Sequence, residues 1–195
     1  SDLLARDAVT LRTLQLSAGE AQARLEGEAG RQTSALWQWK AQGHVQDLDL
    51  RTWWPGEADS EWRRAPQRLQ MDLDTQGSLP EALPSGPLAL WNALRGQVQL
   101  VVHPSVMAGV PVQGRLDIDK RGEQQQAQAD LQLDDGRLQA QWQGQLQAPE
   151  VSNAQVDLKL PHLQALAPWA RLLPALSAWA PQAGQLEAQA RLTPP

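Results

Sequence analysis

The chain has 195 residues, and its 17 Lys and Arg against 22 Asp and Glu leave a formal net charge of −5. An acidic chain lacks the clustered basic surface that nucleic acids require, so we expect no nucleic-acid partner. Cysteine is absent, which excludes disulfides, thiol catalysis and Cys-ligated metal sites. Hydrophobic residues make up 42% of the chain and charged residues 20%, a balance typical of a folded domain.

The sequence contains no candidate membrane helix. No apolar run approaches the ~18–20 residues that a membrane-spanning helix needs. The most apolar stretch, residues 158–180, contains charged residues and three prolines. Because the chain begins at Ser1 and both methionines are internal, we expect it to be a segment of a longer protein, with any anchor outside it.

The first half of the chain alternates apolar and polar residues in short blocks. Residues 21–27, 35–41 and 69–73 follow this pattern, and residues 45–50 follow it after a phase slip that predicts a β-bulge. A period of two is typical of half-buried strands, because successive side chains point to opposite faces of a sheet.

Two stretches instead have helical spacing. Residues 87–94 predict a short helix that starts at Pro87 and ends before Gly96. Residues 162–179 place leucines three to four positions apart, although internal prolines must divide any helix there. We expect one or two short helices, neither long enough to cover a large sheet.

From Gly96 onward the alternation is strict, and turn sequences separate its blocks. Residues 120–123 and 134–136 predict hairpins in which glycine supplies the positive φ, and residues 148–150 predict the next break because of their proline. Such short connections favour an antiparallel meander. We treat residues 1–195 as one segment, with a weak subdivision into 1–85 and 86–195.

A sheet with one aliphatic face must remove that face from water. It can do so by folding into a β-sandwich, by closing as a barrel, or by curling around an apolar ligand. The inward positions mix Leu and Val with many Ala and Gly, which leaves volume that a tight core would have to fill. These residues lean toward a groove, but alternation alone does not choose among the three solutions. The pattern therefore predicts a mainly β fold, a long antiparallel meander that either curls into an open hydrophobic groove or packs as a β-sandwich. The residues expected to line the groove are Val98, Leu100, Val102, Leu116, Ile118, Leu131, Leu133, Leu138, Trp142, Leu146, Val156 and Leu158.

The C-terminal 110 residues resemble the TamB/AsmA-like family. The segments that carry the resemblance are LWNALRGQVQL (90–100), HPSVMAGVPVQGRL (103–116), DDGRLQAQWQG (134–144), VDLKLPHLQALAP (156–168) and GQLEAQARL (184–192). The first 85 residues resemble that family only in their alternation of apolar and polar residues. Asp135 stands in the place of the first residue of the family's usual Gly-Asn pair.

The resemblance implies a location, a fold and a function. TamB-like proteins are anchored in the inner membrane of Gram-negative bacteria, and their periplasmic body is a rolled sheet with a hydrophobic groove, the β-taco. The family is associated with phospholipid transport to the outer membrane and with outer-membrane protein and autotransporter assembly beside a TamA-like barrel. The resemblance therefore predicts acyl chains as the ligand and raises the groove above the sandwich.

No pattern in the sequence predicts catalysis, a cofactor or a metal. The three histidines, His44, His103 and His162, are far apart in sequence and lack ligand spacing. The paired aspartates of several blocks fall on polar strand faces without a ligand loop, as in a solvated surface. No nucleotide-binding or nucleophile motif is present. We expect a non-enzymatic protein.

Two rival functions stay open at this point. A closed β-sandwich would be a lipid-free interaction module for outer-membrane protein biogenesis. A glycan-binding protein would need tryptophans on the polar face, whereas the alternation puts Trp37, Trp39 and Trp142 on the apolar one.

Overall fold

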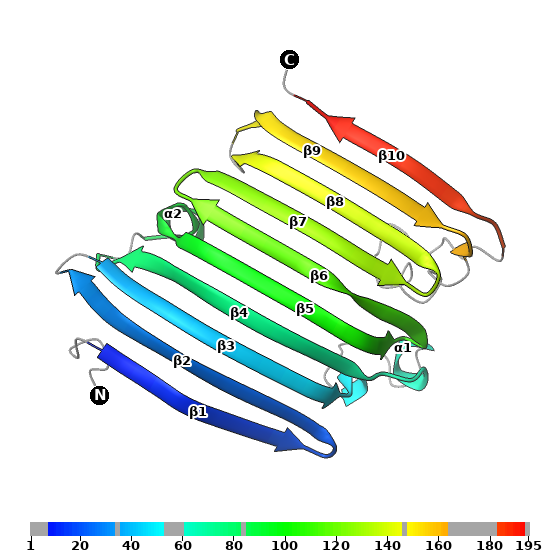
Figure 1. Cartoon of the computed structure of the whole chain (residues 1–195), viewed down its shortest axis with the longest axis horizontal. Helices are drawn as coiled ribbons and strands as arrows, with labels where there is room; N and C mark the ends of the chain where they lie inside the picture. The colour runs from blue at the N-terminus through cyan, green and yellow to red at the C-terminus, as the bar shows by residue number, and fades with distance from the viewer. Residues whose placement is uncertain are drawn as a thin grey trace.

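The computed structural model describes residues 8–33, 36–52, 61–82, 85–145, 148–163 and 183–193. It is mainly β, with ten strands in one antiparallel sheet whose spatial order is the order of the chain (Figure 1). The predicted antiparallel meander is thus confirmed. The strands are β1 (Ala8–Ala18), β2 (Ala21–Thr33), β3 (Leu36–Leu48), β4 (Leu69–Pro80), β5 (Arg95–Met107), β6 (Val110–Arg121), β7 (Gln124–Leu133), β8 (Gly136–Gln145), β9 (Ala148–Leu160) and β10 (Leu186–Leu192).

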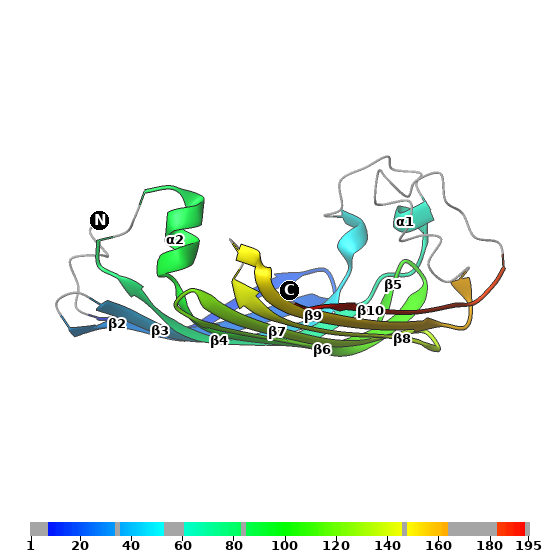
Figure 2. The ribbon, with the colours of Figure 1, turned by 90° about the horizontal axis from the view of Figure 1, so that it is seen from above.

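The sheet is open and is not rolled up. β1 and β10 lie at opposite edges, and the strands bow only gently when seen from above (Figure 2). Register shifts, which bend a sheet locally, occur in five of the nine pairings, whereas β6–β7 and β7–β8 contain none. The described residues form no second sheet, so they do not build the sandwich alternative, and their one sheet stays open without the predicted curl into a groove.

Three short helical segments accompany the sheet, and all of them lie on the same side of it (Figure 2). They are η2 (Leu50–Thr52), α1 (Glu61–Arg64) and α2 (Pro87–Ala93). The prediction of a helix from Pro87 is confirmed; α2 ends at Ala93 because Leu94 adopts an extended conformation. The helical pattern of residues 162–179 lies almost wholly outside the described residues. None of the described helices has the length and hydrophobicity that crossing a bilayer takes.

The turns follow the sequence rules with two corrections. Gly122 has φ +67° in the β6–β7 turn, as predicted. In the β7–β8 turn, however, Asp134 adopts the positive φ, which Asp tolerates, and Gly136 is already the first residue of β8. Pro149 does not separate two strands either, because it lies at the start of β9.

The phase slip near Leu48 is a true bulge. The β3–β4 pairing shifts register between Val45 and Leu48, and Asp47 between them has φ +53°. The same sheet runs across the suggested subdivision at residues 85 and 86, since β4 and β5 pair directly with each other.

The buried core is small and lies toward one end of the sheet. The buried hydrophobic residues of the described part are Leu69, Ala108, Val110, Val112 and Leu160. There the segment after α1 contacts the β5–β6 turn, where the Gly109 N–H donates to the Pro66 carbonyl at 3.0 Å. The middle of the sheet has no comparable cover among the described residues.

Candidate functional site

The candidate site lies on the apolar face of the sheet and consists of three rows of residues that run across all ten strands. Within a row, each residue is the direct partner of the next one on the neighbouring strand. The first row is Leu16, Ala23, Val45, Met71, Val102, Gly114, Leu131, Leu138, Leu158 and Ala188. The second row is Leu14, Leu25, Gly43, Leu73, Leu100, Leu116, Ala129, Ala140, Val156 and Ala190. The third row is Leu11, Gly27, Ala41, Thr75, Val98, Ile118, Ala127, Trp142, Ala154 and Leu192.

The rows contain almost nothing polar. Thr75 is the single residue of the three rows with a polar side chain. Neighbouring strands are ~4.8 Å apart, so the nine steps from β1 to β10 give the rows a length of about 43 Å. The face is thus a continuous aliphatic strip that runs perpendicular to the strands.

This strip is accessible rather than packed. None of the row residues is fully buried. The exposed fraction reaches 59% at Leu16 and 54% at Leu192 on the edge strands, and it is still 37% at Val156. Burying one large aliphatic side chain contributes ~1.5–3 kcal/mol, so covering this face would gain a large free energy.

The predicted lining residues that the structure describes lie on the apolar face, as the alternation predicted. Ten of the twelve lie in the three rows, and Leu133 lies on the same face beside Val112. Leu146 lies outside the described residues. Trp37 and Trp39 share this face too, on β3, as expected.

Sequence reasoning missed how far the strip extends into the first half of the chain. Leu11, Leu14 and Leu16 on β1 begin the three rows, but a register shift between Leu11 and Leu14 interrupts their alternation. The repeated leucines were the signal that could have indicated an apolar strand here. The alternation did not reveal it because the bulge returns Leu11 to the same face as Leu14 and Leu16.

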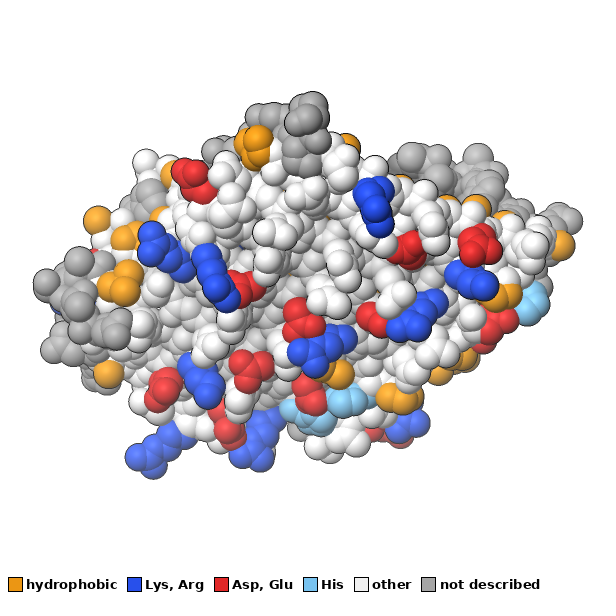
Figure 3. All heavy atoms as spheres, turned by 45° about the horizontal axis from the view of Figure 1, so that its top comes forward, with side chains coloured by type: hydrophobic (Ala, Val, Ile, Leu, Met, Phe, Trp, Pro, Cys, Tyr) orange, Lys and Arg blue, Asp and Glu red, His pale blue; other side chains and the backbone are white. Residues whose placement is uncertain are grey.

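The opposite face is polar and internally neutralised. Lys, Arg, Asp and Glu side chains lie interspersed across it (Figure 3). Asp117 shows the usual arrangement: it accepts hydrogen bonds from Arg115 Nε at 2.5 Å and from Gln99 Nε2 at 3.0 Å. The hydrogen bond from Arg115 is the main reason why the pKa of Asp117 is lowered.

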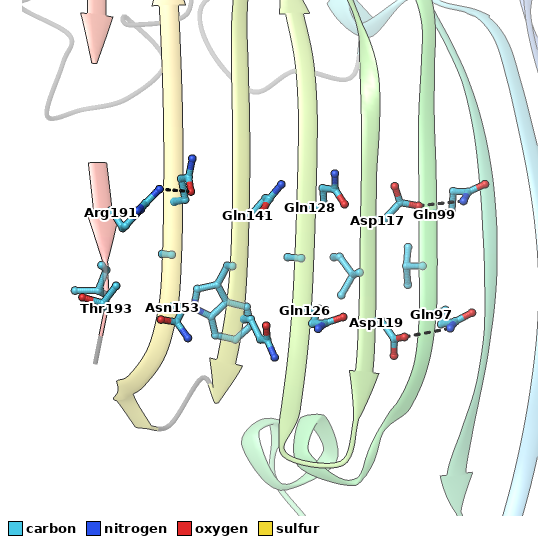
Figure 4. A pocket seen from close by; sticks show the side chains of 18 of the residues that line it. Gln97, Gln99, Asp117, Asp119, Gln126, Gln128, Gln141, Asn153, Arg191 and Thr193 are labelled. Carbon is cyan, nitrogen blue, oxygen red and sulfur yellow. Dashed lines mark hydrogen bonds between the residues drawn. The ribbon is translucent and has the colours of Figure 1, made fainter. Parts of the chain in front are cut away.

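A shallow hollow of about 650 Å³ lies on this polar face. Amides and carboxylates of β4 to β9 make up most of its lining, which also includes Val98, Ile118 and Trp142 of the third row. Gln97 donates to Asp119 within it (Figure 4). Its outer end is formed by Arg191, which donates to Gln155 at 3.2 Å. The hollow offers hydrogen-bond donors and acceptors from its amide and carboxylate side chains.

The structure brings two of the distant histidines together. On the polar face, His44 Nδ1 lies 2.5 Å from Asp72 Oδ1 and His103 Nε2 lies 2.6 Å from Asp72 Oδ2. These hydrogen bonds, the one with His44 foremost, lower the pKa of Asp72. His162 pairs separately with Asp135 at 2.6 Å. In the part of the chain that the structure describes, no group of His, Asp or Glu is arranged to hold a metal ion.

No protein-family model matches this chain, and searches of curated proteins and of solved structures found no significant match. The resemblance to TamB-like proteins therefore stays a prediction from the quoted segments. Any function assigned to the chain must come from its sequence and from the geometry of its two faces.

Proposed function

We propose that this chain is a lipid-conducting structural segment of a TamB-like envelope protein, with the aliphatic strip as its lipid-contacting surface. The observation that carries the proposal is the strip itself: about 43 Å of aliphatic side chains that the described residues leave uncovered. The segment would act in the periplasm as part of an inner-membrane-anchored protein, without enzymatic activity.

The chemistry of the strip favours an acyl chain over a polypeptide strand or loop. An extended polypeptide laid on this face would lose water from its backbone N–H and C=O groups. Thr75 alone could return a side-chain hydrogen bond from within the three rows. An acyl chain has no such groups to satisfy, and each CH₂ that it buries is worth ~0.8 kcal/mol.

The uniformity of the rows favours movement over storage. One long acyl chain could gain ~10 kcal/mol on a fully apolar surface, which would trap it at any single deep site. Across the three rows each step from strand to strand meets another apolar residue, Thr75 excepted, so no single position offers a specific polar contact. A chain can therefore slide without a large barrier, and a surface poor in specific contacts suits transport.

The family resemblance supplies the rest of the proposal. It assigns phospholipid as the cargo, the outer membrane as the destination, and a TamA-like outer-membrane barrel as the partner in outer-membrane protein and autotransporter assembly. A lipid-free interaction module is the competing outcome, and lipid content separates the two.

Photo-crosslinking at two adjacent positions tests the proposal. Leu131 lies on the aliphatic strip and Gln132 is exposed on the opposite face of the same strand. A photoreactive residue at Leu131 should capture phospholipid in cells, and one at Gln132 should capture several-fold less. Equal capture at both positions, or a purified segment that yields no phospholipid on extraction, would contradict the proposal.

A further inference from the structure

The apolar face changes in character along the strands, from the aliphatic third row toward the end of the sheet where α2 lies (Figure 2). Two residues further along each strand in that direction lies a fourth row on the same face. This row consists of Val9, Ala29, Trp39, Gly77, Gly96, Lys120, Gln125 and Gly144. On β9, Ser152 continues it, because its side chain occupies the space in front of Gly144.

The fourth row contains the polar side chains that the three aliphatic rows lack. Lys120, Gln125 and Ser152 lie on β6, β7 and β9, and all three are buried. The Lys120 Nζ donates to the carbonyl of Gly122, and the Ser152 Oγ accepts from the Gln145 N–H at 3.1 Å. The aliphatic surface of these strands therefore ends in polar groups and in the turns that follow them.

Tryptophan and a cation mark the same border on the first strands. The indole of Trp39 lies across Gly77 of β4, in the place that a Cβ there would take. Next to it on the same face, the Arg31 guanidinium lies 5.5 Å from the centre of the Trp37 ring and pairs with Glu81 at 2.5 Å. Tryptophan and long cationic side chains combine an apolar body with a polar tip, and they are enriched where hydrocarbon meets water.

The other end of the aliphatic strip is closed by packed apolar residues. Beyond the first row, Val112 and Leu160 are buried, as is Leu69 at the start of β4. The polar side chain there, Ser105, is buried too and accepts from the Gln70 N–H at 3.0 Å. A charged group at this end would have to displace packed residues, whereas the border next to α2 already carries polar groups.

The distance between the two ends suits a lipid that lies along the strands. On β6, the aliphatic positions from Val112 to Ile118 span six residues, or ~20 Å at 3.3 Å per residue. The hydrocarbon layer of one leaflet, half of a bilayer core of ~30 Å, is ~15 Å thick. A phospholipid lying along a row instead would hold its phosphate over aliphatic side chains, which offer no hydrogen bond in exchange for lost water.

We propose that a phospholipid binds with its acyl chains along the strands and its headgroup at the border formed by the fourth row. This inference rests on the proposed lipid-conducting function and adds the orientation of the cargo. Transport is then a sideways displacement from strand to strand, in which the headgroup follows the border and the acyl chains stay on the aliphatic rows.

Fluorescence quenching by spin-labelled lipid tests this orientation in a chain that has no native cysteine. A small fluorophore is attached to the full chain at Ala29→Cys, in the fourth row, or at Ala23→Cys, in the first row. Both alanines are half-buried on the same face of β2, and their separation of six residues is ~20 Å. The quencher is phosphatidylcholine with a nitroxide either on its headgroup or near the end of one acyl chain.

The headgroup nitroxide should quench the fluorophore at position 29 at least twofold more than at position 23, and the chain-end nitroxide should show the reverse. Glu28→Cys is the control, because Glu28 is exposed on the polar face and a label there should be quenched little by either lipid. Ala127→Cys and Leu133→Cys repeat the comparison on β7 with the same spacing, in case a label disturbs β2.

Two results would overturn the orientation while leaving the proposed function intact. One is equal quenching of both apolar positions by both nitroxides, as expected for acyl chains that lie along the rows. The other is stronger quenching of positions 23 and 133 by the headgroup nitroxide, which would place the headgroup at the packed end. Quenching of no apolar-face position by either lipid would overturn the proposed function together with the orientation.

Discussion

Asp72 illustrates how single residues hold neighbouring strands together on the polar face. Its two carboxylate oxygens lie 2.5 Å from His44 of β3 and 2.6 Å from His103 of β5. Because these partners lower its pKa, Asp72 stabilises the folded state at pH values above its unfolded-state pKa of about 3.9. This contribution is lost as the pH falls through the lower folded-state pKa.

We predict that Asp72→Asn lowers the free energy of unfolding at pH 7 by about 0.5–1 kcal/mol. The loss is modest because about half of the side chain is exposed and water screens the interaction. Urea denaturation at pH 7 and at pH 2.5 measures it, and the two proteins should be nearly equal at the lower pH. Asp74→Asn is the control: Asp74 accepts from the neutral amide of Gln42 and should matter less. A deficit that is undiminished at pH 2.5 would refute the ionic explanation.

Gly96 and Gly43 show how the spacing between strands depends on individual glycines. Both lie on the apolar face within strands. A Cβ at Gly96 would lie 2.3 Å from the Gln76 carbonyl oxygen of β4, whereas a Cβ at Gly43 would meet nothing closer than 3.6 Å. Gly96→Ala must therefore push β5 away from β4, but Gly43→Ala fits as it stands.

We expect Gly96→Ala to destabilise the protein by about 1–3 kcal/mol, the usual cost of overpacking. Gly43→Ala should be neutral or stabilising by about 0.4–1 kcal/mol, because alanine restricts the unfolded chain. Chemical denaturation of the two variants side by side measures both effects. Equal losses would mean that the β4–β5 distance is not set by Gly96.

Alternation predicted most of the strands and their faces, but it missed β1, whose bulge interrupts the pattern, and it could not predict the contacts between strands. A period of two fixes which side of a strand each residue occupies, so Leu131 and Gln132 were assigned to opposite faces correctly. Register is different when the connections are long, because no turn rule then sets it. β3 and β4 are joined through residues 49–68, so no turn rule predicts that His44 meets Asp72, and the bulge between Val45 and Leu48 shifts the register beside that pair.

The openness of the sheet depended on information that periodicity does not contain. Alternation shows that one face is apolar, and it is equally consistent with a sandwich, a barrel and an uncovered sheet. Whether the apolar face is covered depends on which elements pack against it. The described helices α1 and α2 are only 4 and 7 residues long, so they cover little of it.

At the scale of the whole molecule, an uncovered strip makes stability depend on a ligand. A ligand that binds only the folded state stabilises it by RT ln(1 + [L]/Kd), about 2.7 kcal/mol at a ligand concentration 100 times Kd. If acyl chains cover the strip, the melting temperature of the chain should rise progressively with added phospholipid. If the strip binds no lipid, the melting temperature should stay the same as phospholipid is added.

Leu131→Arg tests where that stabilisation originates. A charge in the first row raises the cost of placing an acyl chain across β7, since the guanidinium must lose water. The side chain of Leu131 is not fully buried, so the lipid-free protein should unfold at nearly the same denaturant concentration as the wild type. The lipid-dependent rise in melting temperature should fall by at least half in Leu131→Arg and stay unchanged in Gln132→Arg, which places the same charge on the polar face. If both variants respond to phospholipid as the wild type does, acyl chains do not bind along the strip.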